Sequence, residues 1–135
     1  MVGYSGTPLW KKLGYKDCTA AYADGAPSGY VKLLALPKEI RVTWLAKAGV
    51  GTEFVHLFSR SAAELKAKLK AYRKSIAPHG VVWVSWPKKS SGVATDITED
   101  AIRDVALPTG LVDIKVCAVD ETWSGLKLMI RKELR

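Results

Sequence analysis

The stretch WVSWPKKSSGVATD, residues 83–96, places two lysines and two serines directly after an apolar run. Ammonium groups and hydroxyls beside the backbone N–H groups of a helix start are groups that bind anions. The order of strand, polar loop and helix is typical of phosphate-binding loops, and also of many ordinary connections. Lys88, Lys89, Ser90 and Ser91 are therefore the first candidates for an anion-binding site. The alternative is that they are solvated loop residues, and the sequence leaves both interpretations open.

Further residues join these four if the chain forms a mostly parallel sheet. Ligands of open parallel sheets bind beyond the carboxyl ends of the strands. Arg60, the turn DGAPSG at residues 24–29 and the turn around Trp123 would then emerge at the same edge as Lys88 and Lys89. We expect this site to hold a small anionic or nucleotide-like ligand, whose identity the sequence does not give.

No catalytic constellation stands out among the remaining polar residues. His56 stands in an apolar run, which favours a structural histidine over a general base. Asp120 and Glu121 are adjacent, and adjacent side chains at a strand end point apart, unlike an acid–base pair. Cys18 and Cys117 form no CxxC pair and have no histidine at metal-ligand spacing, so no metal site is predicted. We expect a binding domain rather than an enzyme, and these residues identify no cofactor.

The composition is that of one folded domain spanning residues 1–135, with 48% hydrophobic and 25% charged residues. No apolar run approaches the roughly 18–20 residues that a membrane span needs. The N-terminal residues lack a charged segment followed by an apolar one, so no signal peptide is predicted. Two cysteines far apart in the sequence are typical of free thiols in a reducing compartment, and we expect a cytoplasmic protein.

The net charge of +8 favours anionic partners, including nucleic acid. Much of the excess lies in residues 60–91, which hold eight Lys and Arg residues against one acid, Glu64. Most of these lysines fall on the side of a predicted helix opposite to its apolar stripe, so a solvated helix face explains them as well. Tyr72 belongs to the apolar stripe, and no nucleic-acid-binding motif is found. A basic, nucleic-acid-associated protein therefore stays as an alternative.

Signals for helix caps and for strands alternate along the chain. Helix starts are indicated by Thr7, by Ser28, by the capping box of Ser61 and Glu64, and by Asp96 with Glu99. Strands are predicted at residues 18–23, 40–45, 54–58, 81–86, 111–119 and 126–132. This alternation predicts an α/β three-layer, Rossmann-like sandwich, mostly parallel, with an antiparallel strand pair at the C-terminus. The direction of the strand at 40–45 is left open, because too few residues follow it for a helical crossover.

From residue 53 onward, the chain resembles the second half of the class I S-adenosylmethionine-dependent methyltransferases. TEFVHLF is similar to the family's fourth strand, SIAPHGVVWVSWP resembles its "LkpGG-strand" segment, and the closing strand pair resembles its last two strands. The stretches SGTPLWKKLG, WVSWPKKSSGVATD and WSGLKL together also resemble a small bacterial family of uncharacterised domains. This second resemblance spans the whole chain and brings no activity with it.

The methyltransferase resemblance implies a cofactor site at a glycine-rich turn after the first strand, which places Asp24, Gly25 and Gly29 in that site. It also implies an acidic residue at the end of the second strand, where this chain has Lys47. A strand and a helix of the family's first half are missing as well. A reduced S-adenosylmethionine-dependent methyltransferase is therefore the alternative to a non-catalytic binding domain.

Overall fold

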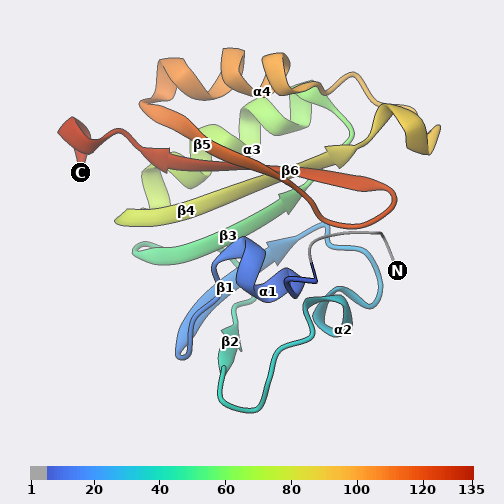
Figure 1. Cartoon of the computed structure of the whole chain (residues 1–135). Helices are drawn as coiled ribbons and strands as arrows, with labels where there is room; N and C mark the ends of the chain where they lie inside the picture. The colour runs from blue at the N-terminus through green and yellow to red at the C-terminus, as the bar shows by residue number, and fades with distance from the viewer. Residues whose placement is uncertain (1–5) are drawn as a thin grey trace.

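A six-stranded sheet forms the centre of the computed structural model, which describes residues 6–135 (Figure 1). Its strands, in the order β2-β1-β3-β4-β6-β5, are β1 (Thr19–Asp24), β2 (Val42–Trp44), β3 (Thr52–Phe58), β4 (Ile76–Pro87), β5 (Leu111–Ala118) and β6 (Trp123–Ile130). Strands β1 to β4 are parallel to one another, and β6 is antiparallel to both β4 and β5. The predicted α/β sandwich with a C-terminal antiparallel pair is therefore confirmed.

Helices cover both faces of this sheet. α1 (Leu9–Leu13) and α2 (Tyr30–Leu34) lie on one face, which we name the α1 face, and α3 (Ala62–Ser75) and α4 (Glu99–Ala106) lie on the other, the α3 face (Figure 1). Three short 3-10 helices complete the elements: η1 (Lys89–Ser91), η2 (Leu107–Thr109) and η3 (Lys132–Leu134). Alternate residues of a strand enter the two cores, so that Val55 and Leu57 of β3 pack under α3, and Phe54 and Phe58 pack under α1.

The basic helix α3 begins where the capping box predicts it. The Ser61 hydroxyl accepts a hydrogen bond from the N–H of Glu64 at 3.2 Å. Leu65, Leu69, Tyr72 and Ile76 repeat at helical spacing, which predicts a helix that continues through Ile76 to a turn at residues 78–80. This prediction is wrong. Ile76 begins β4 instead, because its backbone pairs with Thr52 of β3 and its side chain is buried.

The start of α4 is also placed differently from the prediction. Thr98 caps this helix, with its hydroxyl accepting from the N–H of Ala101 at 3.1 Å, so the prediction of Asp96 as the cap is wrong. Asp96 instead accepts from the N–H of Ala62 at 2.7 Å. Its carboxylate therefore stabilises the first turn of the neighbouring helix α3.

The two short helices of the α1 face begin one residue later than the sequence predicts. Their N-cap residues are Pro8 and Gly29 rather than Thr7 and Ser28, and neither cap has a side-chain hydrogen bond. Gly14 ends the first of these helices in the left-handed conformation, with a φ of 87°.

The connection from β2 to β3 explains the strand whose direction the sequence leaves open. β2 is a three-residue edge strand parallel to β1. Residues 45–51 then cross β1 without a helix and start β3 on its other side. The N–H of Gly51 donates to the carbonyl of Ser75 at 2.7 Å, which fixes the end of this crossing against the end of α3.

Candidate functional site

Four loops meet at one edge of the sheet, beyond the carboxyl ends of its parallel strands (Figure 1). β1 ends at Asp24, β3 at Phe58 and β4 at Pro87, and β6 begins at Trp123, which pairs with Pro87. The candidate segments of the sequence therefore follow or precede adjacent strands at this place, which we name the carboxyl edge. Open α/β sheets bind their ligands at such an edge.

The KKSS segment forms a closed turn at this edge. The N–H of Lys88 donates to the carbonyl of Thr122 at 2.7 Å, which joins the turn to the β5–β6 connection. The Ser91 hydroxyl donates to the carbonyl of Lys88 at 2.6 Å and is thus engaged with the backbone. Lys89 and Ser90 are exposed. Hydrogen bonds within the protein fix the backbone of this turn. The exposed side chains of Lys89 and Ser90 are therefore available to a ligand.

The neighbouring turn, before β6, is built on Asp120. Its Oδ1 accepts from the N–H of Thr122 at 2.8 Å and from the N–H of Trp123 at 2.7 Å, the pattern of an Asx turn. The Trp123 ring meets the Phe58 ring edge to face, with centroids 5.1 Å apart. β6 consequently begins at Trp123 rather than at residue 126 as predicted, and this tryptophan is held in place by packing.

Three cations at the carboxyl edge have no carboxylate partner within residues 6–135. Arg60 and Lys89 are exposed, and Lys88 is half-buried. The carbonyl of Arg60 accepts from the Thr95 hydroxyl at 2.8 Å, which brings the segment before α4 against the end of β3. Unpaired cations on adjacent loops create a positive potential that attracts anions.

A cavity of about 360 Å³ opens between η1 and the start of α4. Its polar lining comes from Lys89, Thr95, Thr98 and Glu99. The Thr98 hydroxyl is engaged as the cap of α4, and the Glu99 carboxylate accepts from Arg103 at 3.0 Å. Lys89 is the one predicted site residue in this lining. Sequence reasoning missed the two threonines and Glu99, although the polar run before the helix was a signal for them.

The glycine turn after β1 lies against the end of β3. Gly25 has a φ of 70°, and a Cβ on it would lie 2.8 Å from the carbonyl oxygen of Phe58. Gly29 has a φ of 81° and open space around it. Gly25 is therefore required by close approach as well as by its backbone angle, and Gly29 by its backbone angle alone. Ala26 in the same turn packs against the core of the α1 face.

Asp24, at the end of β1, directs its carboxylate toward α3. The Nζ of Lys68 donates to Oδ1 at 3.1 Å, and the Tyr72 hydroxyl donates to Oδ2. Only 9% of Asp24 is exposed. Burial, together with the hydrogen bond to Asp24, raises the pKa of Tyr72. Asp24 therefore completes a buried contact between β1 and α3.

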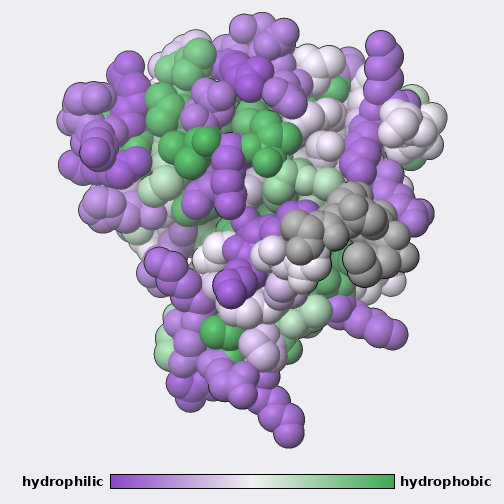
Figure 2. Space-filling model, viewed as in Figure 1, coloured by the Kyte–Doolittle hydropathy of each residue, from purple (hydrophilic) through white to green (hydrophobic). Residues whose placement is uncertain are grey.

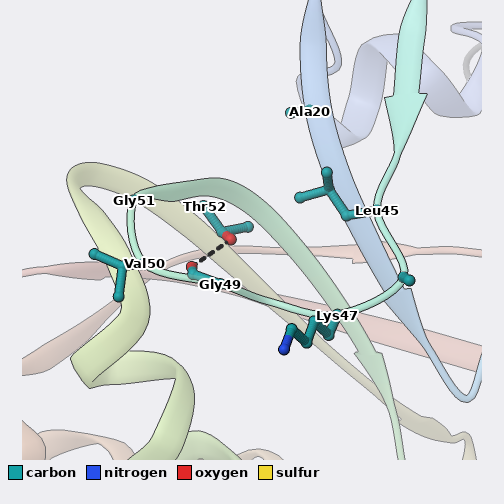
Figure 3. A pocket seen from close by; sticks show the side chains of 8 residues that line it. Ala20, Leu45, Lys47, Gly49, Val50, Gly51 and Thr52 are labelled. Atoms are coloured by element: carbon teal, nitrogen blue, oxygen red, sulfur yellow. Dashed lines mark hydrogen bonds between the residues drawn. The ribbon is translucent and has the colours of Figure 1, made fainter.

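The end of β2 offers no carboxylate to a ligand (Figure 3). Trp44 is followed by two apolar residues and then by Lys47, where the chain turns back across β1. The crossing segment and Ala20 of β1 line an open cavity of about 460 Å³. Figure 3 shows the Lys47 side chain extending away from Ala20, and the Thr52 hydroxyl bonded to the carbonyl of Gly49 at 2.6 Å. Lys47, which stands near where the methyltransferase resemblance implies an acidic residue, is thus part of the segment that connects β2 to β3.

A chain of buried polar groups crosses the core of the α1 face. The Tyr15 and Tyr30 hydroxyl oxygens lie 2.7 Å apart, Tyr30 Oη lies 2.7 Å from His56 Nδ1, and His56 Nε2 lies 2.7 Å from Ser85 Oγ. Burial lowers the pKa of His56 to about 3 and raises the pKa of both tyrosines. These side chains are therefore neutral near neutral pH, and His56 is the structural histidine that its apolar sequence context predicts.

Within residues 6–135, no cluster of three His, Cys, Asp or Glu side chains could hold a metal ion. None of the helices described here has the length and apolar character to cross a membrane. Cys18 is exposed, Cys117 is half-buried, and both are free. Burial raises the pKa of the Cys117 thiol.

Comparison with solved structures shows that the fold is that of the class I S-adenosylmethionine-dependent methyltransferases. Magnesium protoporphyrin IX methyltransferase (ChlM) from Synechocystis PCC 6803 with bound SAH matches with a TM-score of 0.60 and 11% identity, over 90% of this chain and 78% of that chain. A putative type 11 methyltransferase from Sulfolobus solfataricus matches with a TM-score of 0.58 and 12% identity, over 84% of this chain and 85% of the methyltransferase chain. TnmH matches with a TM-score of 0.67 and 12% identity, over 91% of this chain and 53% of the TnmH chain. No family model and no curated protein sequence matches the chain.

Identities of 11% and 12% define the fold and not the activity. The similarity confirms the methyltransferase-like topology that the second half of the sequence predicts. The resemblance to a small bacterial family through the SGTPL, WVSWPKK and WSGLKL stretches stays a prediction, and its first residue, Ser5, lies outside the described residues.

Proposed function

We propose that the protein binds a small anionic, nucleotide-like ligand at the carboxyl edge and catalyses no reaction there. The observation that carries this proposal is the set of unpaired cations, Lys88, Lys89 and Arg60, on adjacent loops of that edge. The strand order supports the proposal. The chain passes from β1 to β2 on one side of β1, and β3 pairs with the other side of β1, so the strand order reverses at this place. Such a switch point is where ligands of open α/β sheets bind.

Three features of the chain favour this proposal over methyl transfer. Lys47 lies three residues after the end of β2, and the chain has no carboxylate there that would hold the ribose hydroxyls. Asp24 is engaged by Lys68 and Tyr72 on the α3 face. Ala26 packs into the core at the turn where the backbone would have to approach a cofactor.

A thermal-shift screen with phosphate, sulfate and adenine nucleotides tests the proposal. At least one of these anions should raise the melting temperature of the parent, because a ligand stabilises only the state that binds it. The double variant Lys88→Ala/Lys89→Ala should lose this response while keeping nearly the parent's own melting temperature, since neither lysine forms an ion pair within residues 6–135 and charges near the surface contribute little to stability. The matched control is Lys66→Ala/Lys70→Ala, which removes the same charge from exposed positions of α3 and should keep the response.

Three outcomes would contradict the proposal. One is that no anion raises the melting temperature of the parent. Another is that the Lys88→Ala/Lys89→Ala protein responds as the parent does, which would make the two lysines solvated loop residues. The third is an equal loss in both double variants, which would assign the response to net charge alone.

The methyltransferase alternative is supported by the fold, since solved structures of ChlM contain SAH or SAM. Isothermal calorimetry with S-adenosylmethionine and S-adenosylhomocysteine separates it from the proposal. An enzyme of this kind must bind its cofactor, so the absence of heat removes the alternative. Binding that the Lys88→Ala/Lys89→Ala variant retains would favour the alternative over the proposed anion site.

A nucleic-acid role is the third candidate and depends on the exposed lysines of α3. It predicts that Lys66→Ala/Lys70→Ala weakens binding of a labelled oligonucleotide more than Lys88→Ala/Lys89→Ala does. Such binding falls steeply with salt because counterions are released. A titration without binding at low salt would remove this candidate.

A further inference from the structure

The α1 face of the sheet is covered unevenly. α1 and α2 pack against β1, β3 and β4, whereas neither helix lies over the start of β5 and the end of β6 (Figure 1). Figure 2 shows apolar surface over this hairpin, interrupted by hydrophilic side chains. We name this uncovered area the hairpin face.

The strand register decides which side chains belong to the hairpin face. Leu126, Leu128 and Ile130 of β6 are buried in the core of the α3 face. Lys127 and Met129 alternate with them and therefore point to the opposite side. Across the strands, Lys127 pairs with Lys115, and Met129 pairs with Val112 and Val81. The hairpin face thus consists of Val112, Lys115, Lys127 and Met129, with Val81 at its border, where it packs against the core of the α1 face.

Lys115 and Lys127 lie opposite each other on this face, and the charge of Lys16 also acts on Lys127. Burial lowers the pKa of Lys127, and the positive charges of Lys115 and Lys16 lower it further. Within residues 6–135, none of these three lysines forms an ion pair. Like charges directly opposite each other on paired strands are destabilising. The isolated protein therefore gains no stability from the Lys115–Lys127 pair, and a negative group placed over the pair would remove the repulsion.

We propose that the hairpin face docks an acidic, amphipathic segment of a partner protein. Its carboxylates meet Lys115 and Lys127 of this face and the neighbouring Lys16, and its aliphatic side chains cover Val112 and Met129. A second copy of this chain would bring the same lysines and a net charge of +8, so it would be repelled. Single-stranded nucleic acid prefers aromatic side chains between the cations, and the hairpin face holds valines and a methionine instead. This surface uses none of the residues of the proposed anion site.

Fluorescence anisotropy with a labelled peptide of alternating glutamate and valine tests the charged part of the proposal. The variant Lys115→Glu/Lys127→Glu should weaken this binding by about tenfold or more. The matched control Lys66→Glu/Lys70→Glu makes the same charge change on α3 and should stay within about twofold of the parent. A peptide of alternating lysine and valine should show the opposite preference and bind the Lys115→Glu/Lys127→Glu protein better than the parent.

Met129→Ser tests the apolar part, because it should weaken binding of the glutamate–valine peptide and leave binding of polyglutamate unchanged. Circular dichroism checks the fold of each variant, and Lys115→Gln/Lys127→Gln replaces the charge reversal if that protein unfolds. The proposal is overturned if both charge reversals lose binding equally, or if polyglutamate binds as tightly as the alternating peptide. It is also overturned if an oligonucleotide or a phosphatidylserine vesicle depends on Lys115 and Lys127 more strongly than the peptide does.

Discussion

The Nδ1 of His56 lies 2.7 Å from the hydroxyl oxygen of Tyr30, in the core between β3 and α2. The other ring nitrogen, Nε2, lies 2.7 Å from the hydroxyl oxygen of Ser85, and His56 has no exposed surface. The neutral imidazole therefore has a partner at each nitrogen, whereas the protonated ring would place a buried charge beside two neutral hydroxyls. Burial accordingly lowers the pKa of His56 to about 3.

We predict that the free energy of unfolding decreases as the pH falls below about 6.5, the ordinary pKa of histidine. The unfolded chain takes up a proton at His56 in this range, and the folded protein does not do so until about pH 3. The loss from His56 alone is about 2 kcal/mol between roughly pH 7 and pH 5. Urea unfolding at the two pH values measures it. Equal stability of the parent at both would contradict the assignment, and a folded His56→Gln variant should lack this pH dependence.

The cap that Asp96 provides to α3 gives a second prediction. Asp96→Ala removes the acceptor for the N–H of Ala62 and should lower the free energy of unfolding by about 1 kcal/mol. Asp96→Asn keeps an acceptor oxygen and should lose less. Asp104→Ala, which removes the same charge from an exposed position of α4, is the control and should be nearly neutral. A loss in the control equal to that of Asp96→Ala would assign the effect to net charge.

Gly25 and Gly29 share a positive φ but differ in their surroundings, and this difference is measurable. Gly29→Ala should cost about 1 kcal/mol of stability, the usual strain of a left-handed alanine. Gly25→Ala should cost at least ~1 kcal/mol more, because its Cβ would overlap the Phe58 carbonyl oxygen at 2.8 Å. Denaturant unfolding of the two variants compares them. If Gly29→Ala proved the more damaging, the close approach of β1 and β3 would not be what requires Gly25.

Most of the fold could be predicted from the sequence because its signals are local. The continuous apolar run of β4 is typical of a strand covered on both faces, and the stripe of α3 has the period of a helix. The alternation of such segments implies a parallel sheet. The ends of elements were harder to predict because contacts between distant residues decide them. Ile76 leaves the helical pattern to pair with Thr52, and Asp96 bonds to Ala62, 34 positions away.

The candidate site was predictable as a place but not as a set of contacts. Parallel strands share a carboxyl edge, so the segments that carry Arg60 and Lys88 could be assigned to it. The bond from Lys88 to Thr122 depends on how the β5–β6 hairpin sits beside β4, which no local pattern encodes. The pairing of Lys115 with Lys127 depends on a register shift in β5, and this too has no local sequence signal.

Asp24 allows the structural and the ligand-binding roles of the glycine turn to be separated. If the Asp24 carboxylate stabilises the contact with α3, Asp24→Asn should lower the free energy of unfolding by about 1.5–3 kcal/mol. Lys68 then loses its buried counter-charge, and the Tyr72 hydroxyl loses a charged acceptor. Tyr72→Phe should lower it too, and the double variant should lose less than the sum, since both changes act on the same hydrogen bond between Tyr72 and residue 24. The thermal shift given by anions should persist in the Asp24→Asn protein. A cofactor-binding Asp24 would produce the reverse result, in which stability is kept and the ligand response is lost.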